Sequence, residues 1–458
     1  MTTPLLMGID LGSTGVKVLV SDADGAELVV EQAATPWIHG AAGAAELDGR
    51  TLLDTVIELC RSACARLAPQ VEPDPVRISA IGVTGMGEAG FVVGPDGVPR
   101  SRALAWFDPR GESQLSAMPA SLAREFAGRT GLPLGVQVSV MKVLYLRDEG
   151  LDLEGCHWAN LPEWIVAQLG GRVAAERSLA SRTGFIDQDS GAPWGPMLAH
   201  LGVKQDFVPT LMTAGSSWGT VAGEGLPAAI AGAHLTVAGH DHLVAARAGG
   251  EMPADRYHVS MGTAEVILQV LDAPLSAGAR DRLAQHFINH VNHVVPGQYV
   301  LVAGVKTGLL MRRAFDLFGV TDSDQRTALD HSARRLPPGG TLPDGAIDVH
   351  GARNDDGMLS LVIRADGATP PEVFARILEH GNDEIRLLLQ AMAREAPVPS
   401  STLMSGGWTR MDSVVDARSR VLPRVEVSHR SQDTALGAAL ASAALAGTEP
   451  TPHLTHHQ

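Results

Sequence analysis

The sequence predicts a two-domain α/β protein, and three observations lead to this prediction. The chain has 458 residues, and a chain of this length usually divides into domains that each have their own hydrophobic core. Apolar runs of strand length alternate along it with runs of helical periodicity. A hairpin pattern at Met7–Val20 returns in fainter form at Tyr257–Val270, in the other half of the chain. We therefore expect two related domains, residues 1–229 and residues 230–458.

Each hairpin contains a turn of glycine and hydroxyl residues between two apolar runs. The first turn spans Gly12 to Gly15, and the second is Gly262 followed by Thr263. Glycine lets backbone N–H groups approach an anion closely, and Ser or Thr hydroxyls add donors, so such turns suit phosphate. One turn of this kind is more often only a tight turn. Its repetition favours two turns that hold one polyphosphate.

Two charged residues accompany the first turn. Asp10 ends the incoming strand, where its carboxylate is able to orient a water molecule on a metal ion. Lys17 follows two residues after the turn. The plainer interpretations are a turn-capping carboxylate for Asp10 and a solvated strand residue for Lys17.

Composition and charge exclude several classes of protein. Charged residues make up 19% and hydrophobic residues 45% of the chain, which is typical of a globular soluble protein. A formal charge of −15 argues against a nucleic-acid partner. The three cysteines form neither a disulfide framework nor a zinc set. The N-terminus lacks the features of a signal peptide, and no run of 18 apolar residues occurs, so we expect a cytoplasmic protein without a membrane partner.

Further elements follow in order after the first hairpin. Apolar residues recur on one face of a helix expected from about Gly49 to Ala68, and Arg77–Thr84 has the composition of a buried strand. A segment rich in Gly and Pro, residues 201–232, is the expected hinge before a strand at Leu235–Gly239. A long helix is expected from about Pro371 to Ala396.

The segment Gly85–Gly90 has the G-x-G-x-x-G spacing of a dinucleotide site. The match fails on context, because a strand and a turn follow it, whereas the dinucleotide motif must open a helix. What remains is a glycine-lined strand exit that holds Met86 and Glu88, which suits the wall of a pocket.

Two other places carry candidate polar residues. Asp241 follows a strand and precedes a helix, so its carboxylate could point into a cleft or could simply cap the helix. Its neighbours His240 and His242 lack further ligands at metal-like spacing and are expected to be solvated or to support Asp241. Trp106 and Asp108 either hold a sugar or form a structural Trp with a surface Asp–Arg pair.

The ordered motifs resemble those of a known family. IDLGSTGVKVLV, TGMGEAG, AWFDPRG, TGLPLGVQVSVMK, SRTGFID, AGHDH, SMGTAE, SGGWTR and TALGAALAS together are similar to the FGGY carbohydrate kinases, from about Met7 to Gly447. The resemblance implies an α/β fold of two ribonuclease-H-like, actin-like ATPase domains with a cleft between them. It also implies ATP-dependent phosphorylation of a hydroxyl of a small sugar or polyol, with ATP and Mg²⁺ and with homodimers frequent in the family.

The resemblance implies roles for individual residues. Asp241 would be the general base, and Asp10 and Asp241 would hold Mg²⁺. The ATP phosphates would be bound by Gly12, Ser13, Thr14, Lys17, Gly262 and Thr263. The adenosine would contact Gly304, Gly308, Gly406, Gly407, Trp408 and Arg410. The substrate would contact Met86, Gly87, Glu88, Trp106, Asp108, Gln137 and Asp241.

The substrate turn departs from the patterns of the family. Pentulose kinases usually carry Gln-Met-His-Gly there and glycerol kinases Gln-Arg-Glu-Thr, whereas this chain has Gly-Met-Gly-Glu from Gly85 to Glu88. Gln137 lies where an aromatic residue is common in glycerol kinases. A ketose such as a pentulose, a polyol and an aldonate all stay open as substrates. A catalytically silent ATP- and sugar-binding sensor of the same fold, and a dehydrogenase that uses the Gly85–Gly90 glycines, are the alternatives.

Overall fold

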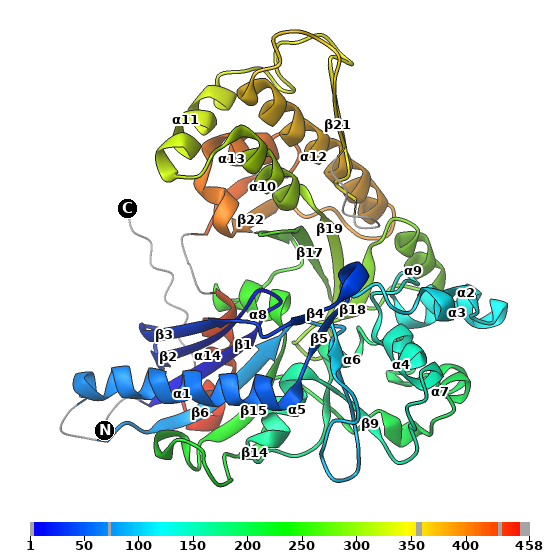
Figure 1. The fold of residues 1–458 in the computed structure, drawn as a ribbon, viewed down its shortest axis with the longest axis vertical. Coiled ribbons are helices and arrows are strands. Elements are labelled where there is room, and N and C mark those ends of the chain that lie inside the picture. Colours follow the sequence, from blue (N-terminus) through cyan, green and yellow to red (C-terminus); the bar gives the residue numbers. More distant parts are fainter. Residues whose placement is uncertain (1–3, 72–74, 354–359, 429–432, 449–458) are drawn as a thin grey trace. The chain divides into compact units, whose positions relative to one another are not determined.

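The computed structural model describes residues 4–71, 75–353, 360–428 and 433–448 (Figure 1). It divides into two compact units. Unit 1 comprises Met1–Glu251, Val291–Gln298 and Gln432–Gln458. Unit 2 comprises Met252–His290 and Tyr299–Ser431.

The core of unit 1 is a six-stranded sheet in the order β14-β15-β6-β1-β2-β3. Its strands are β1 (Leu5–Leu11), β2 (Gly15–Asp22), β3 (Glu27–Ala34), β6 (Ile78–Gly85), β14 (Gly219–Thr220) and β15 (His234–His240). The predicted first hairpin is confirmed, since β1 and β2 pair antiparallel with Asp10 opposite Lys17. β1 also pairs in parallel with β6, and β6 in parallel with β15. The carboxyl ends of β1, β6 and β15 therefore lie side by side at the same end of the sheet.

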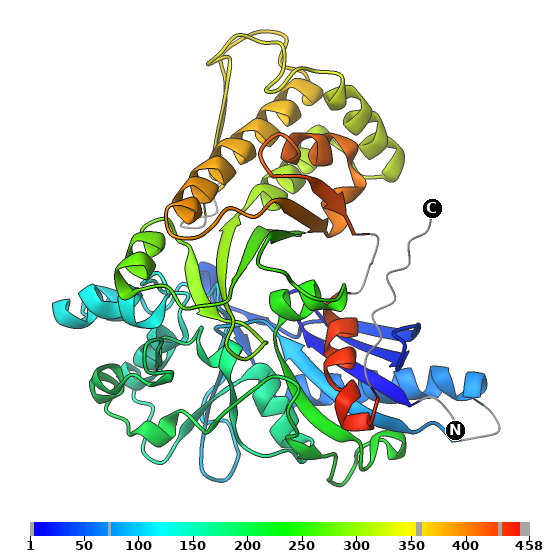
Figure 2. The ribbon, with the colours of Figure 1, turned by 180° about the vertical axis from the view of Figure 1, so that it is seen from behind.

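Alternating side chains of the sheet pack on two different helices. Met7, Ile9 and Leu11 belong to a core that includes residues of α1 (Gly49–Val71). Leu6 belongs to a second cluster, which includes residues of α14 (Asp433–Ala441). Figure 2 shows α14, in red, lying across the blue strands.

Two glycines of the sheet allow this helix to approach. A Cβ atom at Gly8 would lie 1.8 Å from the carbonyl oxygen of Ala435, and one at Gly82 would lie 1.8 Å from that of Ala438. Any larger residue would therefore push α14 off the sheet.

Shorter elements complete unit 1. Its remaining helices are α2 (Glu112–Ser116), α3 (Ala120–Thr130), α4 (Ser139–Asp148), α5 (Leu161–Gln168), α6 (Arg177–Ala180), α7 (Gly195–Leu201) and α8 (Asp241–Ala248). Its short strands are β4 (Ile38–His39), β5 (Ala45–Leu47), β7 (Gly90–Val93), β8 (Ala103–Leu104), β9 (His157–Asn160), β10 (Ala175–Glu176), β11 (Ile186–Asp187), β12 (Ala192–Pro193) and β13 (Leu211–Met212). The 3₁₀ turns are Ala41–Gly43, Gln205–Phe207 and Ala228–Ile230.

Unit 2 is built on a second mixed sheet, in the order β18-β19-β17-β16-β22-β23. The strands are β16 (Arg256–Met261), β17 (Glu265–Leu271), β18 (Asn289–Asn292), β19 (Tyr299–Val305), β22 (Ser401–Ser405) and β23 (Val425–Val427). The second predicted hairpin is confirmed as the antiparallel pair β16 and β17. Both hairpins therefore lie in the interior of their sheets.

Helices of unit 2 bury its apolar core. They are α9 (Ala277–Ala284), α10 (Thr307–Phe318), α11 (Ser323–Arg334), α12 (Pro370–Ala393) and α13 (Asp412–Arg418), and a 3₁₀ turn of this unit is Gly407–Arg410. A further 3₁₀ turn, Ala443–Ala446, belongs to unit 1. β20 (Ile347–His350) and β21 (Ser360–Ile363) form a separate hairpin. The predicted long helix is confirmed by α12, which begins after Thr369 with two prolines, where missing N–H groups cost nothing.

The expected boundary between residues 229 and 230 falls inside unit 1. β15 pairs along its length with β6, so residues 230–251 belong with the first sheet. The expected hinge at 201–232 is also part of unit 1, because Trp218 is fully buried and its N–H donates to the carbonyl of Leu235 at 2.8 Å. The abundance of Gly and Pro there produces tight turns within a domain, not a linker.

Candidate functional site

The first predicted phosphate turn joins β1 to β2, and its shape is held by side chains of the segment that follows β3. The Gly12 N–H donates to the carbonyl of Gly15 at 3.1 Å. Thr35 Oγ1 donates to the carbonyl of Gly12 at 2.6 Å, and Trp37 Nε1 donates to that of Ser13 at 2.7 Å. Because these carbonyls are occupied within the protein, the turn is rigid, with Thr14 exposed at its tip.

Asp10 lies at the base of this turn with its side chain buried. It is 7% exposed, and Oδ1 makes no hydrogen bond to any residue that the structure describes. Burial, reinforced by the negative charge of Asp241 and opposed by Lys17, raises the pKa of Asp10 to about 7. A buried carboxylate next to a second carboxylate is a site where a cation would be stabilising.

Asp241 is the first residue of α8, directly after β15. Negative charge is favourable at this end of a helix. Its Oδ1 accepts from the backbone N–H of His242 at 2.6 Å and lies 3.3 Å from Nε2 of His240. The strand exit is fixed in turn, since the His240 N–H donates to Ser178 Oγ at 3.0 Å. His240 is only 3% exposed, so it is not solvated but packs beside Asp241 as a supporting residue.

The predicted substrate turn follows β6, the strand between β1 and β15. Met86 and Gly87 are buried there, and Glu88 adopts a left-handed backbone conformation with φ +61°. A non-glycine residue held in this region costs of order 1–3 kcal/mol, and such strain clusters at functional sites. The Glu88 carboxylate forms an ion pair with Arg182. Burial raises the pKa of Glu88, Arg182 opposes this shift, and Asp241 adds to it, so Glu88 and Asp241 share one electrostatic environment.

Asp108 has a structural position. Its side chain is fully buried, and both oxygens are used: Oδ1 accepts from Arg110 N and Nε at 2.9 Å each, and Oδ2 from Arg110 Nη2 at 2.6 Å and Ala45 N at 2.8 Å. Burial alone would raise the pKa of Asp108, but the hydrogen bonds from Arg110 and Ala45 hold it below its usual value. The buried Lys142 donates to the carbonyls of Asp108 and Arg110, so the whole loop is braced. Trp106, in contrast, is 37% exposed.

The other predicted substrate residue, Gln137, is half-buried in the turn that precedes α4, next to Gly135. The contacts of Asp108 brace its own loop, and the substrate role of Trp106 and Gln137 stays a prediction.

The second predicted phosphate turn joins β16 to β17 in unit 2. The Gly262 N–H donates to the carbonyl of Ala264 at 3.0 Å, and Thr263 Oγ1 accepts from Arg312 Nη2 at 3.0 Å. Helix α10 rests directly on this turn, because a Cβ atom at Gly308 would lie only 1.9 Å from the carbonyl oxygen of Gly262. Gly308 is thus required by packing, whatever it contacts in a ligand.

The residues predicted for adenosine lie at three elements of unit 2. Gly304 is in β19, Gly308 is in α10, and Gly406 to Arg410 follow β22. Gly406 has φ +102° and a Cβ atom there would lie 2.5 Å from the carbonyl oxygen of Met261, whereas a Cβ atom at Gly407 would meet nothing within 4 Å. Trp408 packs edge to face on Phe315 with ring centroids 5.2 Å apart. Gly407 is therefore the open glycine of the pair.

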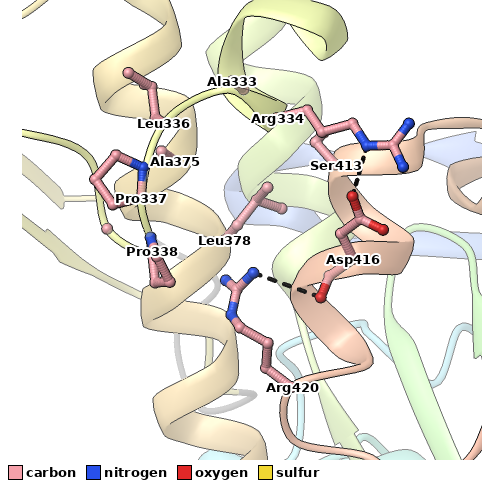
Figure 3. A pocket seen from close by; sticks show the side chains of 11 residues that line it. Ala333, Arg334, Leu336, Pro337, Pro338, Ala375, Leu378, Ser413, Asp416 and Arg420 are labelled. Carbon is pink, nitrogen blue, oxygen red and sulfur yellow. Dashed lines mark hydrogen bonds and ion pairs between the residues drawn. The ribbon is translucent and has the colours of Figure 1, made fainter.

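A small pocket in unit 2 contains none of the predicted site residues. It encloses about 40 Å³ between α11, α12 and α13, and its lining residues are Ala333, Arg334, Leu336, Pro337, Pro338, Gly339, Ala375, Leu378, Ser413, Asp416 and Arg420 (Figure 3). Its two arginines are directed at Asp416: Arg334 Nε donates to Oδ2 at 2.6 Å and Arg420 Nη1 to the backbone carbonyl at 3.4 Å. These contacts join helices, and we assign no ligand to the pocket.

Three residues of these environments were not predicted as functional. Arg182 lies in the SRTGFID motif that supports the family resemblance, and this motif was the signal that could have identified it. Glu265 and Arg418 form a buried ion pair next to the second turn, and the distance between them in the sequence gives no indication of this contact.

The described residues contain no group of three or more His, Cys, Asp or Glu side chains placed to hold a metal ion. None of their helices is long and apolar enough to cross a bilayer.

The known proteins that this chain resembles are carbohydrate kinases. The model of the FGGY family of carbohydrate kinases, N-terminal domain, matches residues 5–246. The autoinducer-2 kinase of Escherichia coli K12 is 25% identical over 478 residues, covering 96% of this chain and 86% of the relative.

Solved structures agree with this. The xylulose kinase from Rhodospirillum rubrum superposes with a TM-score of 0.81 at 21% identity, covering 97% of this chain and 91% of that one. The glycerol kinase of Plasmodium falciparum with ADP superposes with a TM-score of 0.83 at 16% identity, covering 97% and 90%. These likenesses confirm the predicted α/β fold with two actin-like domains.

Proposed function

Because the chain belongs to the FGGY family of carbohydrate kinases, we propose that it transfers the γ-phosphoryl group of ATP to a hydroxyl of a small sugar or polyol, with Mg²⁺ as its metal ion. The observation that carries this proposal is that Asp10, at the end of β1, and Asp241, directly after β15, follow strands that both pair in parallel with β6, so the two carboxylates belong to the same end of one sheet. A ketose such as xylulose, glycerol, an aldonate such as gluconate and autoinducer-2 are the acceptors to test.

Asp241 is the proposed general base. The backbone N–H of His242 and the packed His240 hold its Oδ1, which orients the carboxylate at the start of α8. The attacking hydroxyl would donate its proton to this carboxylate as the bond from its oxygen to the γ-phosphorus forms and the bond from that phosphorus to the bridging oxygen breaks, which releases ADP. Positioned general bases contribute about 10² to 10⁴ in rate.

The two glycine turns are the proposed phosphate sites. Ser13 and Thr14 would offer backbone and hydroxyl donors, with Lys17 as the nearby cation, and Thr263 would do the same from unit 2. Gly12 and Gly262, whose own N–H groups close the turns, would let the phosphates approach the backbone. Rigid donors need no reorganisation as charge develops on the transferred group, which is the main way proteins accelerate phosphoryl transfer. Gly407, the open glycine, is the best-supported contact for the adenosine.

Asp10 and Asp241 would hold Mg²⁺. The donor set fits, because Asp10 Oδ1 is buried without a hydrogen bond from the described residues and carboxylate oxygens are the ligands this ion prefers. When bound, Mg²⁺ would neutralise charge on the phosphates. Met86, Gly87 and Glu88 would contact the acceptor, and the contacts of Asp108 favour a supporting role for that residue.

The experiment is coupled ADP release with ATP and Mg²⁺ over xylulose, glycerol, gluconate and autoinducer-2. We expect one acceptor to raise ADP release well above the acceptor-free rate, and Asp241→Asn to lower kcat by about 10² to 10⁴. Asp241→Ser is the matched control for the helix start, since serine also accepts N–H groups there but is no base.

Both variants should lose turnover while they keep the wild-type melting temperature and ATP affinity. Full turnover in Asp241→Asn would remove Asp241 from the base role. ATP binding without turnover on any acceptor would favour the sensor.

A further inference from the structure

Arg182 has two buried donors without partners. Its side chain is 10% exposed, and Nη2 forms the ion pair with Glu88 Oε1. Nε and Nη1 are buried and make no hydrogen bond to any residue within the described ranges. Buried donors are almost always satisfied, and a guanidinium keeps its protons at any ordinary pH. These two N–H groups are therefore available to an oxygen from outside the chain, either of water or of a ligand.

The guanidinium lies against the substrate turn. A Cβ atom at Gly87 would be 2.8 Å from Arg182 Nε and 3.2 Å from His240 Cδ2, so only glycine lets these side chains meet the turn. Burial lowers the pKa of His240 well below its usual value, and the positive charge of Arg182 lowers it further. Arg182, His240 and the turn form one cluster with Asp241.

The charges of this cluster limit what it can bind. Arg182 is matched by Glu88, so the two side chains together carry no net charge. A substrate carboxylate placed here would add a further negative charge to a site of low exposure, which is unfavourable. A neutral substrate would leave the ion pair balanced.

We propose that Arg182 and Glu88 bind two neighbouring oxygens of a neutral polyhydroxy substrate, and that Arg182 determines specificity. Arg182 Nε and Nη1 donate to a ketone or hydroxyl oxygen, and the Glu88 carboxylate accepts from the adjacent hydroxyl. The proposal rests on the kinase function above and narrows it to ketoses and polyols, with aldonates disfavoured. A purely structural ion pair is the competing interpretation.

The test measures kcat and KM for xylulose, glycerol and gluconate, together with KM for ATP. The neutral acceptor is whichever of xylulose and glycerol the wild type uses better. In Arg182→Gln, KM for this acceptor should rise roughly tenfold or more, because hydrogen bonds from a charged donor are lost. KM for ATP should stay within about twofold, since the ATP turns are untouched.

Glu88→Gln should act in the opposite direction on charge selectivity. It leaves Arg182 without its counter-charge, so kcat/KM for gluconate relative to the neutral acceptor should rise about tenfold. In Arg182→Gln the same ratio should fall. A structural pair would not move the ratio in opposite directions.

Two further variants serve as controls for the single substitutions. The double variant Arg182→Gln with Glu88→Gln removes both charges, and its two amides are able to hydrogen-bond to each other so that the protein still folds. It should no longer discriminate between gluconate and the neutral acceptor by charge. Arg129→Gln is the matched control, because Arg129 is 42% exposed and pairs with Asp187 at the end of the same motif. It should behave like the wild type.

Calorimetric titration of the same variants with xylulose, glycerol and gluconate measures selectivity without turnover. Binding that depends on Arg182 in a protein with no kinase activity would refute the kinase proposal and keep this inference. Unchanged binding and KM in Arg182→Gln, or a wild type that prefers gluconate, would overturn the inference and leave the kinase proposal standing.

Discussion

Arg418 and Glu265 form a bidentate ion pair in the interior of unit 2, and neither side chain is more than 1% exposed. Arg418 Nε lies 2.8 and 3.0 Å from the two carboxylate oxygens, and Nη2 lies 2.9 Å from Oε2. Thr307 Oγ1 donates to the same Oε2 at 2.6 Å. One carboxylate thus ties α13 and the start of α10 to β17, directly after the second phosphate turn.

We expect Glu265→Ala to lower the free energy of unfolding by about 3–5 kcal/mol, because it leaves the Arg418 charge buried and unpaired. Glu426→Ala is the control: its pair with Arg256 spans 3.6 Å and Glu426 is 53% exposed, so the loss should be about 0–1 kcal/mol. Urea unfolding measures both. Equal, small losses in the two variants would show that the buried pair adds nothing.

Asp10→Asn should stabilise the metal-free protein at alkaline pH. The pKa of Asp10 is raised from 3.8 to about 7 in the folded state. A raised pKa means that the stabilisation is fully present below about pH 4 and is lost as pH rises through 7. At pH 8 the variant should gain up to about 4 kcal/mol over the wild type, and the gain should shrink as pH falls toward 4.

Thermal unfolding across this pH range checks the Asp10 prediction, with Asp54→Asn, a surface carboxylate that is 53% exposed, as control. Added Mg²⁺ should raise the melting temperature of the wild type and leave that of Asp10→Asn unchanged, because a ligand stabilises only the state that binds it. A pH-independent difference between wild type and variant would contradict the raised pKa.

The adjacent glycines after β22 should respond differently to alanine. Gly406→Ala should unfold the turn or cost several kcal/mol, because φ +102° and a 2.5 Å contact with Met261 O both oppose a Cβ atom. Gly407→Ala should leave the melting temperature nearly unchanged, since its Cβ atom meets nothing. If Gly407 lies along the adenosine, KM for ATP should rise in Gly407→Ala alone, and an unchanged KM would remove it from the adenosine site.

Asp108→Asn should affect stability more than substrate affinity. An amide cannot accept all four hydrogen bonds that the carboxylate receives, so we expect a loss of about 2–4 kcal/mol. Glu46→Gln is the matched control, because Glu46 accepts from the same Arg110 at 2.6 Å but is 25% exposed. A tenfold increase in acceptor KM at wild-type stability would instead assign Asp108 to the substrate.

Short sequence patterns predicted the structural features that depend on interactions between residues close together in the chain. The two hairpins, the long helices and the strand before Asp241 followed from apolar periodicity, turn residues and proline positions, which act over a few residues. The domain boundary failed for the same reason. Glycines and prolines at 201–232 mark turns wherever they occur, and only the pairing of β15 with β6 places the next segment in unit 1.

The amino-acid sequence was enough to predict the α/β class, both glycine turns and the resemblance to a kinase family, because each depends on residues that lie close together in the chain. The interactions between distant charges follow only from the fold: Asp10 with Asp241, Glu88 with Arg182 and Glu265 with Arg418. Parallel strand pairing brings the ends of β1, β6 and β15 to one edge of a sheet. No spacing in the chain encodes that neighbourhood, since any of several apolar strands could have paired there.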